Sequence, residues 1–309
     1  DNTITAGGES IALSGAGSTS GDIVDGNDVS INSSSSYVTL TGTSDTFSGS
    51  GNMLDMDTGS AATLTNGSDT IDMQTGASLF DDAGSGNDTI DASAGDTIQV
   101  NNDGGSSYLD TINASGDAGI TLDSGSSLDM VGLGNTIATS SSDDLTAGGD
   151  TIDAASGQTL SLTDSGDVQN TVDGTGFTIS QSNGSLAFDG SGTLNGSGVA
   201  LEIDANSKGT VTSSDDAIDM DGGATLIDSA GDGNDTINAS AGDTIQISND
   251  GGSSYLDTIN ANGDAGITLD AGSSLDLVGS GNAVAANNGD QITATDNTID
   301  ANNASLTLT

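Results

Sequence analysis

Short stretches of alternating apolar and polar residues recur along the whole chain, and each follows a turn rich in Gly, Asn, Asp and Ser. In residues 37–41, Val38 and Leu40 fall on one side of an extended backbone, because successive side chains of a strand point to opposite faces. The apolar positions hold mainly β-branched and aliphatic residues, which favour strands. No stretch has a helical period of useful length, and the clearest predicted strands are 37–41, 69–73, 96–100, 119–123 and 127–131.

The spacing of these stretches indicates how the strands are arranged. Strand centres are spaced almost evenly within two runs, one from Ile71 to Ile98 and one from Ile112 to Ile137. Every second strand returns after roughly 17 residues, which is typical of a coil with two strands per turn, stacked on its neighbours as a β-solenoid. The gap between Ile98 and Ile112 is wider than the others and predicts a longer turn around residues 101–107.

A second, longer repeat contains these coils. Residues 83–135 return as residues 230–282, with 45 of 53 positions identical. The repeat weakens outside this block but persists, and the end of the chain begins a third copy. The predicted units are 1–148 for the first solenoid module, 149–295 for the second and 296–309 for the start of a third. We interpret the chain as a window cut from a longer tandem array; a complete protein of two repeats is the alternative.

The sequence therefore predicts an all-β fold, a β-solenoid similar to a parallel β-helix, nested in tandem modules of about 147 residues. Each strand has only two or three apolar side chains, so a single coil cannot bury a core, whereas stacked coils form a continuous one. The absence of Pro agrees with this fold, because Pro is excluded from central strands. The main alternative is an array of immunoglobulin-like sandwiches, which needs longer strands and a larger aromatic core.

Charge changes this interpretation more than any other property of the composition. Asp and Glu number 46 against the single basic residue Lys208, the net charge is −45, and aromatic residues are 2% of the chain. Such a composition leans towards disorder, but the regular placement of apolar residues favours a fold. A basic nucleic-acid surface is excluded, we expect no membrane insertion, and the absence of Cys excludes disulfides. Stacked carboxylates repel one another, so we expect an extracellular or cell-surface setting with abundant cations.

One motif suggests a metal site. The segment GSGNDTI at 84–90 and its copy GDGNDTI at 231–237 have the spacing G-x-G-x-D-x-U. This resembles the calcium-binding nonapeptide of the RTX family, G-G-x-G-x-D-x-U-x, although Ala83 replaces the first glycine. In that family Asp carboxylates and loop carbonyls of a parallel β-roll hold the ion. The resemblance implies that Asp88 and Asp235 are Ca²⁺ ligands; the alternative is that both belong to ordinary tight turns.

The strings GNDTI, VTLTG and GDTI also resemble the strand repeats of very large secreted bacterial surface proteins, such as adhesins, surface-layer proteins and filament-forming proteins. This resemblance implies a structural, non-catalytic protein whose modules associate with copies of the same chain, head to tail or laterally, and with cations. A calcium-dependent RTX-like binding domain is the second hypothesis. Catalysis is disfavoured because His, Cys and Arg are absent. Ice binding is disfavoured because Thr-x-Thr does not recur in every coil.

Overall fold

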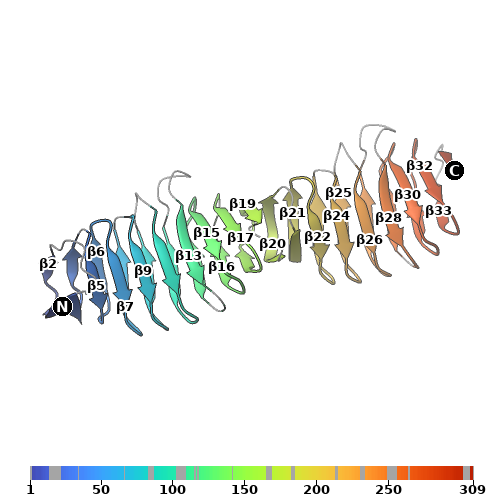
Figure 1. Ribbon diagram of the computed structural model, residues 1–309. Helices are drawn as coiled ribbons and strands as arrows, with labels where there is room; N and C mark the ends of the chain where they lie inside the picture. Colours follow the sequence, from blue (N-terminus) through green and yellow to red (C-terminus); the bar gives the residue numbers. More distant parts are fainter. Residues whose placement is uncertain are drawn as a thin grey trace. The chain divides into compact units, whose positions relative to one another are not determined.

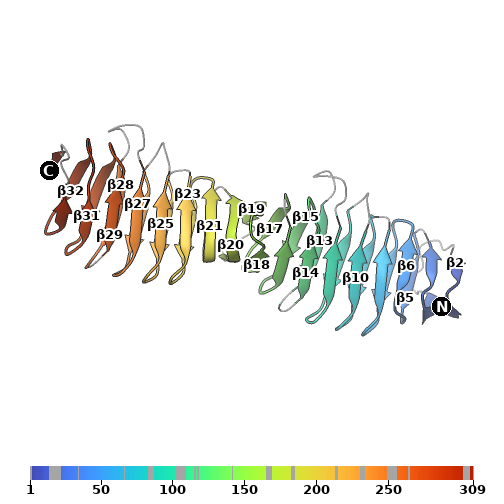
Figure 2. The same ribbon diagram turned by 180° about the vertical axis from the view of Figure 1, so that it is seen from behind.

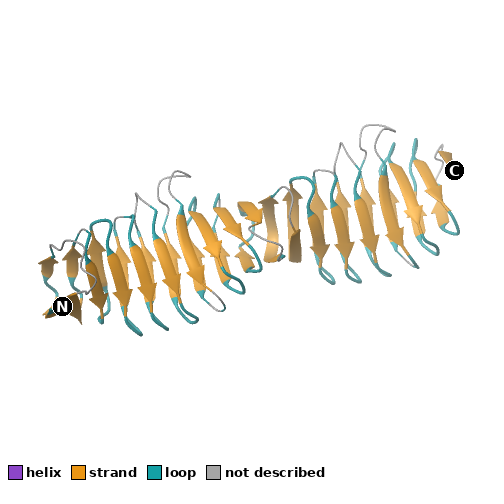
Figure 3. Ribbon diagram, in the orientation of Figure 1, coloured by secondary structure: helices purple, strands orange, loops and turns teal. Residues whose placement is uncertain are grey.

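The computed structural model describes residues 2–13, 22–33, 35–65, 67–82, 87–101, 109–114, 116, 118–140, 142–164, 169–181, 185–212, 215–229, 234–248, 256–263, 265–301 and 307–308. These residues form strands joined by loops and turns, and none of them lies in a helix (Figure 3). A membrane-spanning helix is accordingly not found in the described part of the chain. The fold is all-β, a parallel β-solenoid with two strands per coil.

Contacts between residues divide the chain into two units, Asp1–Asp153 and Ala154–Thr309. The first unit contains strands β1 (Thr3–Gly7), β2 (Ser10–Ala12), β3 (Asp22–Asn27), β4 (Ser30–Asn32), β5 (Tyr37–Leu40), β6 (Asp45–Ser48), β7 (Met53–Met56), β8 (Ala61–Leu64), β9 (Thr70–Met73), β10 (Ser78–Asp81), β11 (Thr89–Ala92), β12 (Thr97–Val100), β13 (Asp110–Ala114), β14 (Gly119–Leu122), β15 (Ser127–Val131), β16 (Thr136–Thr139) and β17 (Asp144–Ala147), with β18 (Thr151–Ala154) at its end.

The strands of the first unit alternate between two parallel sheets. One sheet runs from β1 through the odd-numbered strands, and each strand pairs in parallel with the strand two further along the chain. The other sheet contains the even-numbered strands in the same way. The register aligns equivalent residues of successive coils, such as Leu54 with Ile71 and Ile71 with Ile90. Inward positions therefore form columns that run from coil to coil.

The second unit contains strands β19 (Thr159–Asp164), β20 (Asn170–Ser180), β21 (Ser185–Asn195), β22 (Ala200–Ile203), β23 (Lys208–Val211), β24 (Ala217–Met220), β25 (Thr225–Asp228), β26 (Thr236–Ala239), β27 (Thr244–Ile247), β28 (Asp257–Ala261), β29 (Gly266–Leu269), β30 (Ser274–Val278), β31 (Ala283–Ala285), β32 (Gln291–Ala294), β33 (Thr298–Asp300) and β34 (Thr307–Leu308).

In this unit β21 pairs with both β22 and β23, so its 11 residues contribute to both sheets. Figure 1 shows β22, β24, β26 and β28 side by side, in agreement with their parallel register. Figure 2, seen from behind, shows β23, β25, β27 and β29 side by side in the other sheet.

A narrow apolar core lies between the two sheets of each unit. Leu40, Ile71 and Ile98 in the first unit are fully buried, as are Phe177 and Phe188 in the second. The two phenyl rings meet edge to face, with centroids 5.0 Å apart and planes at 85°. Burial of each such side chain contributes about 1.5–3 kcal/mol to the free energy of folding, and the contributions of many coils together stabilise the core.

These observations confirm the predicted fold class and the clearest strands. Residues 37–41, 69–73, 96–100, 119–123 and 127–131 contain β5, β9, β12, β14 and β15. Most of the longer turn predicted at 101–107 lies outside the described residues. Its effect on the register is visible, because the step along the chain from Ile90 to its partner Ile112 is longer than the step from Ile71 to Ile90. The module boundaries at 148/149 and 295/296 stay predictions, since the two units are delimited by contacts and not by the sequence repeat.

Candidate metal site

Aspartate side chains at the turns into the strands point into the solenoid and accept backbone hydrogen bonds from the preceding coil. In the first unit, the N–H groups of Asn52 and Asp69 donate to Oδ1 of Asp69 and Asp88, over 2.7 and 2.6 Å. The N–H of Asp88 donates in turn to Oδ1 of Asp110, over 2.9 Å. We call this series the capping ladder of the first unit. It satisfies backbone donors at a corner where a buried N–H would otherwise lack a partner.

The second unit repeats this ladder at the equivalent positions of the second copy. The N–H groups of Val199, Asp216 and Asp235 donate to Oδ1 of Asp216, Asp235 and Asp257 over 2.8, 2.7 and 3.1 Å. The local sequence explains the arrangement, because a carboxylate one residue before Thr-Ile or Ala-Ile enters the corner while the Ile enters the core. A short side chain is needed there, since it must reach the backbone of the neighbouring coil only one strand spacing away.

A different set of turn aspartates uses both carboxylate oxygens. Oδ1 of Asp243 accepts from the N–H groups of Gly223 and Ala224 on the preceding coil, over 2.7 and 3.1 Å. Its Oδ2 accepts from the N–H of Ser240 in its own turn, over 2.6 Å. Asp290 is bound in the same way. Both oxygens of these carboxylates accept backbone hydrogen bonds, so these aspartates act as structural caps.

The capping ladder differs because a third carboxylate approaches it in each unit. Asp81, the last residue of β10, lies beside Asp88 and Asp110, and one carboxylate oxygen of each lies within 4.8 Å of the others. All three residues are 0% exposed. Oδ2 of Asp88 is buried and accepts no hydrogen bond from the described residues. We call this group triad 1.

The second unit contains the equivalent triad 2, formed by Asp228, Asp235 and Asp257. Its carboxylate oxygens again lie within 4.8 Å of one another, and the three residues are 1–2% exposed. The carboxyl groups of Asp235 and Asp228 are close enough to share a hydrogen bond. Two carboxylates at that distance need a proton or a cation between them, because two bare negative charges would repel strongly in a buried site.

Burial dominates the electrostatics of both triads. Burial is the largest cause, and together with the negative charges of Asp110 and Asp69 it raises the pKa of Asp88 to about 7, against the opposing hydrogen bond from the Asp69 N–H. Burial likewise raises the pKa of Asp235 to about 7, with contributions from Asp216 and Asp257. Along the ladder, burial raises the pKa of Asp69 and of Asp216 to about 6. At neutral pH, burial and the neighbouring charges therefore favour a bound proton or cation in each triad.

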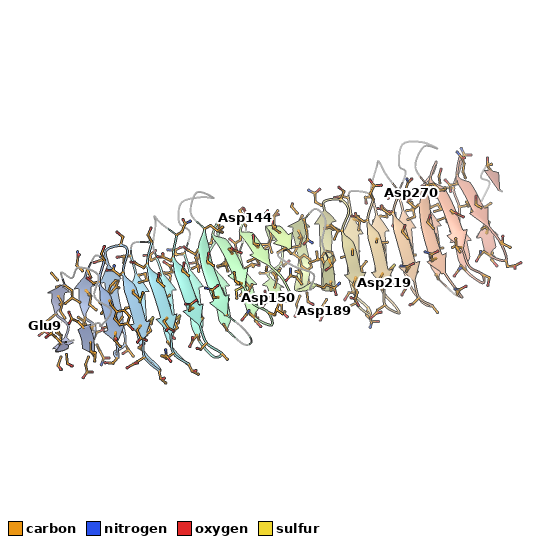
Figure 4. All side chains as sticks on the ribbon, in the orientation of Figure 1. Glu9, Asp144, Asp150, Asp189, Asp219 and Asp270 are labelled. Carbon is orange, nitrogen blue, oxygen red and sulfur yellow. The ribbon has the colours of Figure 1, made fainter. Side chains whose placement is uncertain are left out.

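The donor set of the triads fits a hard cation. Both consist of carboxylate oxygens only, which suit Ca²⁺, Mg²⁺ and Mn²⁺, whereas the chain has no Cys or His for a softer metal. A further acidic group, Glu202, Asp204 and Asp221, differs from the triads because it is only partly buried or exposed. Figure 4 shows other acids at separate places along the chain, among them Asp144 on β17, Asp219 on β24 and Asp270 directly after β29.

The structure places the two predicted ligands, Asp88 and Asp235, in the middle of the triads, while the glycines of the motif, at 84, 86, 231 and 233, lie outside the described residues. Whether a metal binds stays a prediction. The motif did not point to the partners Asp81, Asp110, Asp228 and Asp257. A signal for Asp81 was present in the alternation, because Leu79 points inward and the residue two positions later must do the same.

The arrangement defines a class of protein, a repeat protein with a parallel β-solenoid fold and buried acidic corners. Comparisons of the chain with protein-family models, with curated proteins and with solved structures find no match. The functional argument therefore rests on the residues of this chain.

Proposed function

We propose that the chain is a structural, non-catalytic repeat protein that builds a rigid extracellular fibre, surface layer or adhesin stalk by end-to-end stacking of solenoid modules. The observation that supports this most directly is the parallel stacking of coils within each unit. Successive coils align residue for residue in parallel register, and turn side chains tie each coil to the next. Parallel ladders of this kind can continue from one copy to the next, because a further copy offers the same strands and the same core.

Mechanical stiffness follows from the same contacts. Each coil is joined to its neighbour by two ladders of backbone hydrogen bonds, by a column of apolar contacts and by the buried aspartate caps. Bending or stretching a unit would have to disturb all of these together. The outward-facing positions, such as Asp55, Asp72 and Asp91 in adjacent coils of one sheet, present a negative surface that attracts water and cations.

The test is assembly of the purified chain, followed by electron microscopy and by light scattering over a range of protein concentrations. We expect filaments or sheets whose mass grows with concentration. Ile11→Asp places a charge beside the half-buried core of the first described coils and should weaken end-to-end growth. Met53→Asp, at a site that is 49% exposed on an outer face, is the matched control and should leave such growth intact. A chain that stays monomeric at high concentration would argue against the proposal.

The second candidate function is a calcium-dependent secreted binding domain. The two triads favour it, because a fold that encloses three acids gains stability from any cation that binds there. Circular dichroism during a calcium titration from chelator tests this candidate. Conversion of a disordered chain to strand would support it, and a strand spectrum that ignores calcium would leave the fibre proposal standing without a metal.

A further inference from the structure

The alternation of strand β10 places an acid in the core. Leu79 is buried, Phe80 points outward, and Asp81 is buried at a position that is apolar in the adjacent coils. Its register partners are Leu64 on one side and Val100 on the other. An aliphatic residue would continue this column, so an ionised acid here costs stability unless it is hydrogen-bonded and paired with a proton or a cation.

The same substitution occurs in the second unit. In β25, Leu226 is buried, Ile227 points outward and Asp228 is buried. The register partners of Asp228 are Val211 and Ile247, again aliphatic. This core acid therefore occurs at equivalent positions of the two units, beside two ladder carboxylates and between aliphatic register partners.

The capping of backbone N–H groups does not by itself explain why the ladder positions hold carboxylates. Asn52 occupies the ladder position one coil before Asp69, and its Oδ1 accepts the N–H of Ser36 over 3.2 Å. A neutral amide therefore serves as a cap. The negative charge at Asp88, and the buried Oδ2 that accepts no hydrogen bond from the described residues, go beyond what capping requires.

The geometry of the three oxygens matches a large hard cation. Three oxygens no more than 4.8 Å apart have a common point within about 2.8 Å of each, close to the 2.3–2.6 Å of Ca²⁺–oxygen bonds. Mg²⁺ would need a tighter approach, at about 2.0–2.1 Å, and retains several waters that a buried corner does not readily accommodate. The chain's only basic side chain, Lys208, lies on β23 and is exposed, so it cannot neutralise the buried acids.

We propose that triad 1 (Asp81, Asp88 and Asp110) and triad 2 (Asp228, Asp235 and Asp257) each bind one divalent cation of the calcium type, which joins two successive coils from inside the core. The inference rests on the calcium-dependent candidate above and specifies its site. Asp81 and Asp88 flank one corner of a coil and Asp110 belongs to the next coil, so the ion links the two. The many exposed acids contribute weak, diffuse attraction, whereas the triads give two saturable sites per chain.

The experiment is equilibrium dialysis with radioactive Ca²⁺ in about 0.15 M NaCl and excess Mg²⁺, conditions that screen the surface acids. We expect two tight sites per chain for the unchanged protein. Asp81→Leu should leave one site, and Asp81→Leu combined with Asp228→Leu should leave none. Asp91→Asn, on β11 two residues beyond Thr89, is the matched control, because Asn238 already stands there in the other repeat; it should retain two sites.

Folding of each variant is checked by circular dichroism in chelator, where Leu at position 81 completes an apolar column and should preserve the strand signal. Asp88→Asn with Asp235→Asn is a second pair that keeps the cap and should also abolish both sites. Tight binding that survives in both double variants, or no saturable binding in the unchanged chain, would overturn the inference. Filaments that form equally well in chelator would then separate this failure from a failure of the fibre proposal.

Discussion

The pH dependence of stability follows directly from the buried ladder and can be worked out with its sign. In the unfolded chain Asp88 and Asp235 titrate near the ordinary value of 3.8, and in the fold the pKa of each is about 7. Between these values the folded chain binds more protons than the unfolded chain. The free energy of unfolding should therefore fall as the pH rises through this window, and should level off above pH 7.

The expected change in the free energy of unfolding is large. A shift of about three pKa units corresponds to roughly 4 kcal/mol for each group when metal is absent. From pH 5 to pH 8 the two groups together should remove on the order of 5 kcal/mol from the free energy of unfolding. Asp69 and Asp216, each with a pKa raised to about 6, add a smaller loss in the lower part of the same window.

The assay is urea unfolding followed by circular dichroism, in chelator and constant high salt, at pH values from 5 to 8. Chelator keeps cations from replacing the protons, and salt screens the charges of the surface acids. The variant Asp88→Asn with Asp235→Asn replaces each carboxyl cap with an amide cap that cannot titrate. The free energy of unfolding of this variant should therefore change much less with pH. The reasoning fails if the unchanged chain is equally stable at pH 5 and pH 8, or if the double variant retains the full dependence.

Three further changes test the packing argument by unfolding measurements. Asp81→Leu should stabilise the metal-free chain by roughly 1–3 kcal/mol, because an apolar side chain replaces a buried acid in an apolar column; destabilisation in chelator would contradict this. Ile98→Ala should cost about 2–5 kcal/mol, whereas Thr97→Ala on the outer side of the same strand should change stability by less than about 0.5 kcal/mol. Gly49→Ala should be strongly destabilising, because φ is +116° and the new Cβ would overlap a carbonyl oxygen of the neighbouring coil. Gly76→Ala, at φ +81° with nothing within 4 Å, should cost only about 1 kcal/mol.

The alternation of residues was sufficient to predict the fold class, because the core of a solenoid is assembled from strands that each carry their own signal. Val38 and Leu40 point inward as the pattern requires, and the return of every second strand fixed the number of strands per coil. The pattern did not reveal how far turn residues are buried. Asp69 begins the predicted strand 69–73 and Asp88 stands two residues before Ile90, but the burial of these acids depends on the N–H groups of the preceding coil, which a single coil does not contain.

The candidate site was predictable only in part for a related reason. The spacing of the motif identified Asp88 and Asp235, since both belong to one continuous segment in their repeat. Asp81 ends the preceding strand, β10, whereas Asp110 begins β13 on the next coil. Their convergence requires the register of β11 with β13, which depends on the length of the turns between them.

The interpretation of the charge also changes once the buried acids are known. Fourteen aspartates among the described residues are buried, so the acidity of the chain is not only a property of its surface. Some, such as Asp243, accept backbone hydrogen bonds on both carboxylate oxygens. The triads bring three buried carboxylates together, and one triad occurs in each unit among the described residues. An array built from such repeats would respond to protons and divalent cations at regular intervals along its length, because each triad adds the same linked free energy to the coils it joins.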